Sequence, residues 1–273
     1  SQSFHGMTGM TDALHITSSK GICEIRLNRP SVHNAFDDGL IAELTKALES
    51  ANRDSSVWGV VLSGEGSTFS AGADLNWMRA MASASEEENR QDSLRLAYLM
   101  RTLNFLSKPT LARVNGSAYG GGVGLVACCD IAIGVESAKF SLSEAKLGLV
   151  PAVISPYVIA AIGLRQARRL FVSAEIFDAR EAMRIGLLHH CVDAGALDEA
   201  VDRNLHFLRK CGPRAQAEAK QLAMRVCGID AESAALQDAR NADLIARLRV
   251  SDEGQEGLTA FLDKRPPRWI SPG

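Results

Sequence analysis

Two glycine-rich turns carry the first residues that could do chemistry. They read FSAGADL over residues 69–75 and NGSAYGGGVG over residues 115–124. In each, small residues lead from a strand-like run into a helical one. The first N–H groups of a helix have no intrahelical partner, so a turn of this kind can bind an anion. Two such turns brought together would form an oxyanion hole.

A dinucleotide-binding loop is a rival interpretation of the second turn. Gly122, Gly124 and Ala127 satisfy G-x-G-x-x-A, and Glu136 follows the next strand. In a dinucleotide fold, however, the acidic residue follows the glycines at a longer interval than here. That interpretation also leaves the first glycine-rich turn without a role, so we favour the oxyanion hole.

Glu144, within SLSEAKLG, is the carboxylate that could complete such a site. Proton transfer beside an oxyanion hole needs a carboxyl group within hydrogen-bond reach of the reacting carbon. Taken alone, Glu144 would be an ordinary acidic residue at a helix start. No G-x-S-x-G nucleophile motif is present, and neither Asp37-Asp38 nor His189-His190 has further ligands at metal spacing, so no metal site is predicted.

An alternation of strands and helices must position these turns. Asp37 or Asp38 is expected to cap a helix with apolar residues at helical spacing. Strands are expected over residues 15–17, 22–27, 57–62, 110–114 and 131–135. Strand, turn and helix recurring in this order predict an α/β core with right-handed crossovers.

From about residue 155 onward, helical patterns dominate. Helices are expected over residues 165–172, 179–185, 197–209, 215–225, 232–249 and 253–263. We therefore divide the chain into a leader or expression remnant over residues 1–12, a core over 13–200 and a helical C-terminal region over 201–273. The many amphipathic helices exceed what the core needs, which predicts self-association.

Composition narrows the class of protein. With 46% hydrophobic residues, 23% charged residues and a net charge of -2, the chain is expected to be a soluble cytoplasmic protein that binds neither nucleic acid nor membranes. No apolar run reaches the roughly 18 residues of a membrane span. Arg165–Arg169 is expected to be a solvated helix face, with a contact to a nucleotide phosphate as the alternative. The 6 cysteines form no C-x-x-C pair, and Cys128 and Cys129 are expected to be small buried hydrophobes.

Several motifs in order carry a family resemblance. They are NRPSVHNAF (28–36), FSAGADL (69–75), NGSAYGGGVGL (115–125), CDIAIG (129–134), FSLSEAKLGLVP (140–151) and TAFLDKRP (259–266). Their order and spacing resemble the crotonase superfamily, the enoyl-CoA hydratases and isomerases. The resemblance covers roughly residues 13–267 and implies a spiral of ββα turns with a C-terminal helical trimerisation region, assembled as a trimer or a dimer of trimers.

The resemblance also implies roles for individual residues. The thioester oxygen would accept hydrogen bonds from the N–H groups of Ala73 and Gly121, and Glu144 would transfer the proton. Coenzyme A, which is part of the substrate and not a separate cofactor, would contact Ser31, Val32, Ala35, Ala71, Asp74, Leu75, Phe261 and Lys264. For Asp74, capping the helix that begins at Leu75 is favoured over proton transfer. Gly121 could also satisfy a turn that needs positive φ.

One departure from the family pattern bears on the reaction. Hydratases with two catalytic glutamates carry the second one where this chain has Gly124, which is expected to leave space there. A single glutamate at the position of Glu144 is also the pattern of Δ3,Δ2-enoyl-CoA isomerases. Trp77, Met78 and Met81 lie at helical spacing and could line an acyl pocket or only pack the core.

Finer resemblance favours hydration. FSAGADLNWM, GGGVGLVACCD and SEAKLGLVPAVISPYV resemble bacterial hydratases of 3-methylglutaconyl-CoA and isohexenylglutaconyl-CoA. We therefore predict a hydratase that adds water to a branched, carboxylated 2-enoyl-CoA. The alternatives are a Δ3,Δ2-enoyl-CoA isomerase and a non-catalytic acyl-CoA binder.

Overall fold

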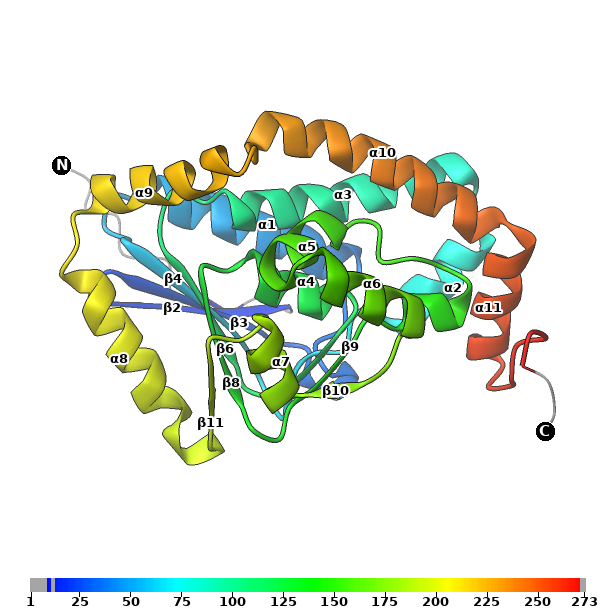
Figure 1. Cartoon of the computed structure of the whole chain (residues 1–273), viewed down its shortest axis with the longest axis horizontal. Helices are drawn as coiled ribbons and strands as arrows, with labels where there is room; N and C mark the ends of the chain where they lie inside the picture. The colour runs from blue at the N-terminus through cyan, green and yellow to red at the C-terminus, as the bar shows by residue number, and fades with distance from the viewer. Residues whose placement is uncertain (1–8, 11–12, 271–273) are drawn as a thin grey trace.

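Two β-sheets form the centre of the molecule in the computed structural model, which describes residues 9–10 and 13–270 (Figure 1). The larger sheet has the order β1-β2-β3-β4-β6-β8-β11 and the smaller one β10-β9-β7-β5. The strands of the larger sheet are β1 (Gly9–Met10), β2 (Leu14–Ser19), β3 (Ile22–Leu27), β4 (Gly59–Gly64), β6 (Thr110–Val114), β8 (Ile131–Val135) and β11 (His190–Val192). Those of the smaller sheet are β5 (Thr68–Ser70), β7 (Ser117–Tyr119), β9 (Lys139–Ser141) and β10 (Phe177–Asp178).

The strands alternate between the two sheets as the chain advances. β4, β6 and β8 pair in parallel in the larger sheet, while β5, β7 and β9, which follow them in turn, pair in parallel in the smaller one. After each pair comes helical structure: α2 (Leu75–Ser83) and α3 (Glu86–Asn104), then α4 (Gly121–Cys128), then η2 (Ser143–Leu147) and α5 (Ser155–Ile162). The predicted spiral of ββα turns is confirmed.

Local sequence explains where these elements begin. Helix α1 (Asp38–Arg53) is capped by Asp37, whose side chain accepts a hydrogen bond from the N–H of Leu40. Helix α3 begins with a capping box formed by Ser85 and Glu88. All six residues of β4 are buried, as expected for a central parallel strand covered on both faces.

The helices that follow α5 pack back onto the two sheets and the helices before them. They are α6 (Leu164–Ser173), α7 (Ala179–Ile185), η3 (Ala194–Ala196), α8 (Leu197–Arg209), α9 (Pro213–Val226), α10 (Ala231–Val250) and α11 (Asp252–Leu262). Helix α10 runs along α3, and α11 turns down beside α2 and η2 (Figure 1). These last two helices bring C-terminal residues next to the core turns.

The predicted boundaries between the leader, the core and the helical C-terminal region can be placed on the structure. Residue 200 lies inside α8, a continuous helix that packs on β6 and β8. The predicted leader, residues 1–12, lies outside the described residues except for β1, which pairs antiparallel with β2. Within the described ranges, no helix is long and apolar enough to cross a membrane.

Two expectations about single segments are confirmed. Cys128 and Cys129 are 2% and 9% exposed, and burial raises the pKa of the Cys129 thiol to about 12. Arg165 and Arg168 are exposed on α6, and Arg169 forms ion pairs with Glu175 and Glu181. The thiols are therefore core groups, and the basic run is a solvated helix face.

Candidate active site

A cavity of about 330 Å³ lies between the two glycine-rich turns and the last two helices. The first turn contributes Ala71, Gly72 and Ala73, and the second contributes Gly120 and Gly121. Glu144 reaches the same cavity from η2. The residues predicted to act on the thioester are therefore assembled in one place.

The backbone around Ala73 turns its N–H away from Phe36. Ala73 forms a parallel bridge with Phe36. The N–H of Phe36 donates to the Gly72 carbonyl at 2.6 Å, and the N–H of Asp74 donates to the Phe36 carbonyl at 2.8 Å. Because the neighbours of Ala73 make both bonds of the bridge, its own N–H points to the other side, and it has no hydrogen-bond acceptor among the described residues.

The N–H of Gly121 is the second free donor. Gly121 is the first residue of α4, and its N–H likewise has no acceptor within the described part of the chain. A Cβ on Gly121 would lie 2.5 Å from Cε2 of Phe36, which explains why the residue is glycine. The positive φ of this turn, 52°, belongs to Gly120 and not to Gly121, so the conformational role suggested for Gly121 was wrong.

Glu144 is an unpaired carboxyl group in apolar surroundings. Its Oε2 is buried and has no hydrogen-bond partner among the described residues, while Oε1 lies beside Gly120. Burial raises the pKa of Glu144 to about 7, and a hydrogen bond from its own backbone N–H opposes the rise. A carboxyl group with this pKa can both take up and return a proton near neutral pH.

The space expected at Gly124 is filled, so that expectation was wrong. A Cβ on Gly124 would lie 2.3 Å from Cγ2 of Ile154 and 3.2 Å from Cε of Met100. Ile154 precedes α5 and is 3% exposed. Close packing of α5 against α4 therefore occupies the place of a second glutamate.

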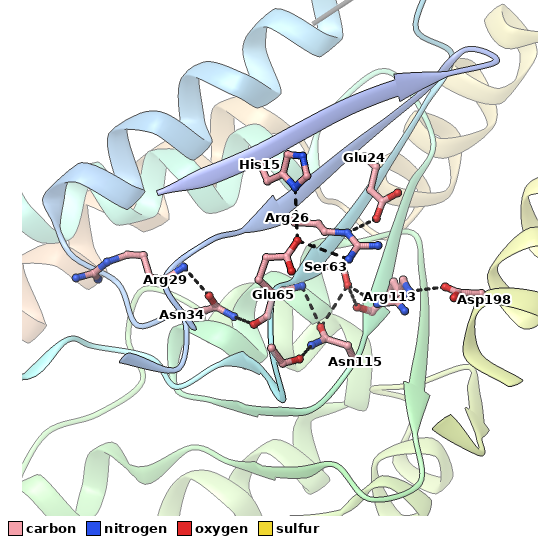
Figure 2. A network of polar contacts seen from close by, with 12 residues as sticks. His15, Glu24, Arg26, Arg29, Asn34, Ser63, Glu65, Arg113, Asn115 and Asp198 are labelled. Carbon is pink, nitrogen blue, oxygen red and sulfur yellow. Dashed lines mark hydrogen bonds and ion pairs between the residues drawn. The ribbon is translucent and has the colours of Figure 1, made fainter. Parts of the chain in front are cut away.

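A polar network fixes the loops that lead into the site (Figure 2). The Asn34 side chain accepts from the N–H of Arg29 at 2.8 Å and donates to the carbonyl of Glu65 at 2.9 Å. Asn115 accepts from the N–H of Gly64 at 3.0 Å and from Oγ of Ser63 at 3.2 Å. Both asparagines thereby hold the β4–β5 turn, so the segments before the two free N–H donors are tied to one another.

The whole arrangement has counterparts in known proteins. The chain matches the family model described as "Enoyl-CoA hydratase/isomerase" over residues 17–272. The chain belongs to the enoyl-CoA hydratase/isomerase family. The Ala73 and Gly121 donors and the Glu144 carboxyl group are accordingly the candidate active site of a hydratase-type enzyme that acts on acyl-CoA thioesters.

Individual members of the enoyl-CoA hydratase/isomerase family resemble this chain over nearly all of it. The 2,3-dehydroadipyl-CoA hydratase of Escherichia coli is 31% identical, covering 93% of this chain and 97% of that protein. The human mitochondrial methylglutaconyl-CoA hydratase is 32% identical, covering 92% of this chain and 74% of that protein. An enoyl-CoA hydratase crystal structure from Shewanella pealeana is 43% identical, with a TM-score of 0.77 over 94% of this chain and 96% of that one. These matches confirm the family and the crotonase fold.

Among the residues predicted to contact CoA, the cavity includes Ala71 and Phe261. Ser31 and Val32 are exposed in η1 (Pro30–Val32), and Ala35 is buried nearby. These three residues do not line the cavity, and neither do Asp74, Leu75 and Lys264. Leu75 is 51% exposed, and Lys264 is exposed after α11.

Asp74 has a structural position, as favoured from the sequence. Its Oδ1 accepts from the N–H groups of Asn76 and Trp77 at 2.8 and 3.1 Å, which caps α2. Its Oδ2 pairs with Arg29 at 3.2 Å. Both oxygens of the carboxylate are therefore engaged within the protein.

Trp77, Met78 and Met81 satisfy both interpretations made from the sequence. They are 7%, 5% and 4% exposed, and they also line the cavity. Sequence reasoning missed the C-terminal wall of the cavity, which includes Ile245 and Arg249 of α10. The available signal was spacing, because Arg249 lies four residues after Ile245 on the buried face of that helix.

Proposed function

We propose that this enzyme adds water to a branched 2-enoyl-CoA that carries a distal carboxylate, of the 3-methylglutaconyl-CoA or isohexenylglutaconyl-CoA type. The observation that carries the reaction type is the convergence of two free N–H donors and one buried carboxyl group on one cavity. The substrate class is supported by the relatives named for methylglutaconyl-CoA and 2,3-dehydroadipyl-CoA, since both names describe acyl groups with a second carboxylate.

In the proposed reaction the two N–H groups hold the thioester oxygen, and Glu144 transfers the proton. The thioester oxygen accepts hydrogen bonds from Ala73 and Gly121, which stabilise the negative charge that develops as the enolate forms. Glu144, ionised at the start, removes a proton from water as the water oxygen bonds to C3. The electrons of the C2=C3 bond move toward the thioester, and Glu144 then returns the proton to C2. The net change is addition of water, and no cofactor beyond the CoA of the substrate takes part.

We propose that the CoA moiety runs from the first glycine-rich turn toward η1 and α11, along the eight residues predicted from the sequence. The N–H of Ala71 donates to the His33 carbonyl at 2.9 Å, which joins η1 to that turn. Phe261 is 48% exposed at the cavity rim, where its ring could cover part of the nucleotide. Because the carboxylate, the N–H and the carbonyl of Asp74 are all engaged within the protein, Asp74 would contact CoA by packing and not by a free donor.

Isomerisation of a 3-enoyl-CoA is the second candidate. The observation in its favour is the packing of Ile154 against Gly124, which excludes a second carboxylate. One base that removes a proton from C2 and returns it to C4 is sufficient for this reaction. The non-catalytic binder has no comparable support, since a binder would have no use for a buried unpaired carboxyl group.

Turnover in labelled water separates these candidates. Purified protein is incubated in H₂¹⁸O with 3-methylglutaconyl-CoA, isohexenylglutaconyl-CoA and an unbranched 3-enoyl-CoA. Hydration gives loss of enoyl absorbance with one ¹⁸O in the product. Isomerisation of the 3-enoyl-CoA gives new conjugated absorbance without label. Failure to hydrate either carboxylated substrate would overturn the proposed substrate class.

We also propose assembly as a homotrimer or a dimer of trimers, in the cytoplasm. Apolar side chains on the outer helices support association, since Val172, Leu222, Val226 and Leu236 are 83%, 50%, 75% and 67% exposed. Helix α9 has no buried residue within the single chain. The free thiols of all six cysteines are in keeping with a reducing compartment.

A further inference from the structure

Arg249 is a buried cation without an acidic partner. It lies near the end of α10 and is 7% exposed. Its Nη1 donates to Ser93 Oγ at 3.1 Å and to Asn89 Oδ1 at 3.3 Å, and its Nε is buried without any hydrogen-bond acceptor in the described part of the chain. Arginine is seldom buried unless it is paired, because removing its charge from water is costly.

Asp92, the acidic residue whose charge acts on Arg249, does not supply that partner. Asp92 is the one charged group that raises the pKa of Arg249, yet burial outweighs it and lowers that pKa to about 10. Asp92 itself pairs with Arg95 at 2.5 Å. No carboxylate of the described residues forms an ion pair with Arg249. Its charge is therefore uncompensated within the chain.

Arg249 lines the same cavity as Ala73, Gly121 and Glu144. The other side chains that line the cavity are mostly apolar, among them Trp77, Met81, Leu96 and Ile245. Glu144 is the one acidic residue among the described residues that line the cavity, and no influence of Arg249 contributes to its pKa. The cavity therefore has a carboxyl group at its reacting end and an unpaired cation elsewhere in an apolar wall.

The other cations of the cavity differ from Arg249. Arg265 pairs with Glu256 at 2.7 Å, and Lys146 is exposed. A role limited to joining α10 to α3 would need only the neutral contacts to Asn89 and Ser93, which a neutral polar side chain can make as well. It would not account for a buried guanidinium group without a counter-ion on a residue that lines a largely apolar cavity.

We propose that Arg249 binds a carboxylate at the far end of the substrate's acyl chain and so selects dicarboxylic enoyl-CoA thioesters over neutral ones. This inference rests on the proposed function, because it places the acyl chain in the same cavity. A guanidinium group matches a carboxylate with two parallel hydrogen bonds. A neutral acyl chain would leave the buried cation unpaired, which is the strongest way for a site to reject an analogue.

The first arm of the test measures binding without turnover. Calorimetry compares glutaryl-CoA, which has a distal carboxylate, with hexanoyl-CoA, which is of similar length and neutral. Wild type is expected to bind glutaryl-CoA at least about 100-fold more tightly than Arg249→Met does, with little change for hexanoyl-CoA. Arg249→Lys should retain part of the preference. Arg247→Met, an exposed position on the same helix, is the matched control and should bind both ligands as wild type does.

The second arm measures kcat/KM for glutaconyl-CoA and hex-2-enoyl-CoA. Arg249→Met should lose activity on the carboxylated substrate and retain it on the neutral one. Equal losses on both substrates, or a wild type that binds the two saturated ligands equally, would overturn the assignment. If a thermal melt shows that Arg249→Met is unfolded, the assignment is judged from the binding preferences of wild type and Arg249→Lys. Absence of all turnover with an intact binding preference would refute the hydratase proposal and support the role of Arg249.

Discussion

At the residue scale, the environment of Glu144 suits it to the proton transfer that we propose. Burial raises its pKa to about 7 without help from a neighbouring charge. Near neutral pH the protonated and ionised forms are then both populated, as a group that takes a proton from water and returns it to carbon requires. Ala73 and Gly121, which carry the two free amide donors, line the same cavity, so in the proposed reaction the carboxyl group has a polarised substrate to act on.

The first prediction concerns proton transfer. Glu144→Gln is expected to lower kcat by about 10³-fold or more with little change in KM, because the amide keeps the shape but cannot cycle a proton. In wild type, kcat/KM should rise with pH through about 7, where Glu144 ionises. Steady-state kinetics between pH 5 and 9 checks both. The control is Glu199→Gln, at an exposed position on α8. A fully active Glu144→Gln enzyme would show that another group carries the proton.

The second prediction concerns stability. A folded-state pKa of about 7 against an ordinary value of 4.5 means that the folded protein keeps a proton which the unfolded chain releases between these pH values. Stability contributed by the protonated group is therefore lost as pH rises through this window, by up to about 3 kcal/mol. Glu144→Gln should be about 1–3 kcal/mol more stable than wild type at pH 8 and similar to it at pH 5. Urea unfolding at both pH values measures this, and an equal difference at both would contradict it.

At the scale of elements, two glycines let helix α4 pack closely against its neighbours. At Gly121 the Phe36 ring occupies the place of a Cβ, and at Gly124 the Ile154 side chain does so. These contacts fix the first half of the short helix that carries the proposed oxyanion donor Gly121. The absence of a second glutamate is thus a property of how α4 and α5 pack together.

The third prediction follows from that packing. Gly124→Glu is expected to lower both hydratase activity and stability, the latter by about 1–3 kcal/mol, because the new side chain overlaps Ile154. Adding Ile154→Ala should recover part of the stability by opening space. Thermal melts and kinetics of the single and double variants test this. The control is Gly39→Glu, at an exposed position in α1 where an added Cβ meets no atom closer than 3.5 Å. A Gly124→Glu enzyme more active than wild type would refute the overlap.

At the scale of the whole molecule, the C-terminal helices have two distinct surfaces. Toward the core, α10 and α11 close the cavity with Ile245, Arg249, Leu258 and Phe261. Outward, apolar residues such as Val226 at 75% exposed remain in contact with solvent in the single chain. Exposed apolar area of this kind is typical of surfaces that associate.

The fourth prediction is the assembly itself. Sedimentation of wild type at micromolar concentration is expected to give trimers or hexamers, because association buries the apolar residues of α9 and its neighbours. Replacing Leu222 and Val226 by aspartate should shift the distribution toward monomer. A monomeric wild type at that concentration would contradict the proposed assembly.

The sequence alone predicted most strands of the larger sheet, most helices and the candidate reacting groups, but it gave no bounds for the four strands of the smaller sheet. Strands 110–114 and 131–135 were predicted with the bounds that the structure has, and Asp74 was predicted as a helix cap. These features depend on local rules, since a cap, a turn or a strand is specified by a few adjacent residues. The two glycine-rich turns and Glu144 also stand in short contiguous motifs.

Only the tertiary structure decided how the site is shaped and charged. The overlap of Ile154 with the space at Gly124, the raised pKa of Glu144 and the place of Arg249 in the cavity wall all arise between segments far apart in the chain. Periodicity indicates which face of a helix is buried but not which segment will cover it. Helix packing angles, and with them the burial of single charges, depend on the side chains of both partners.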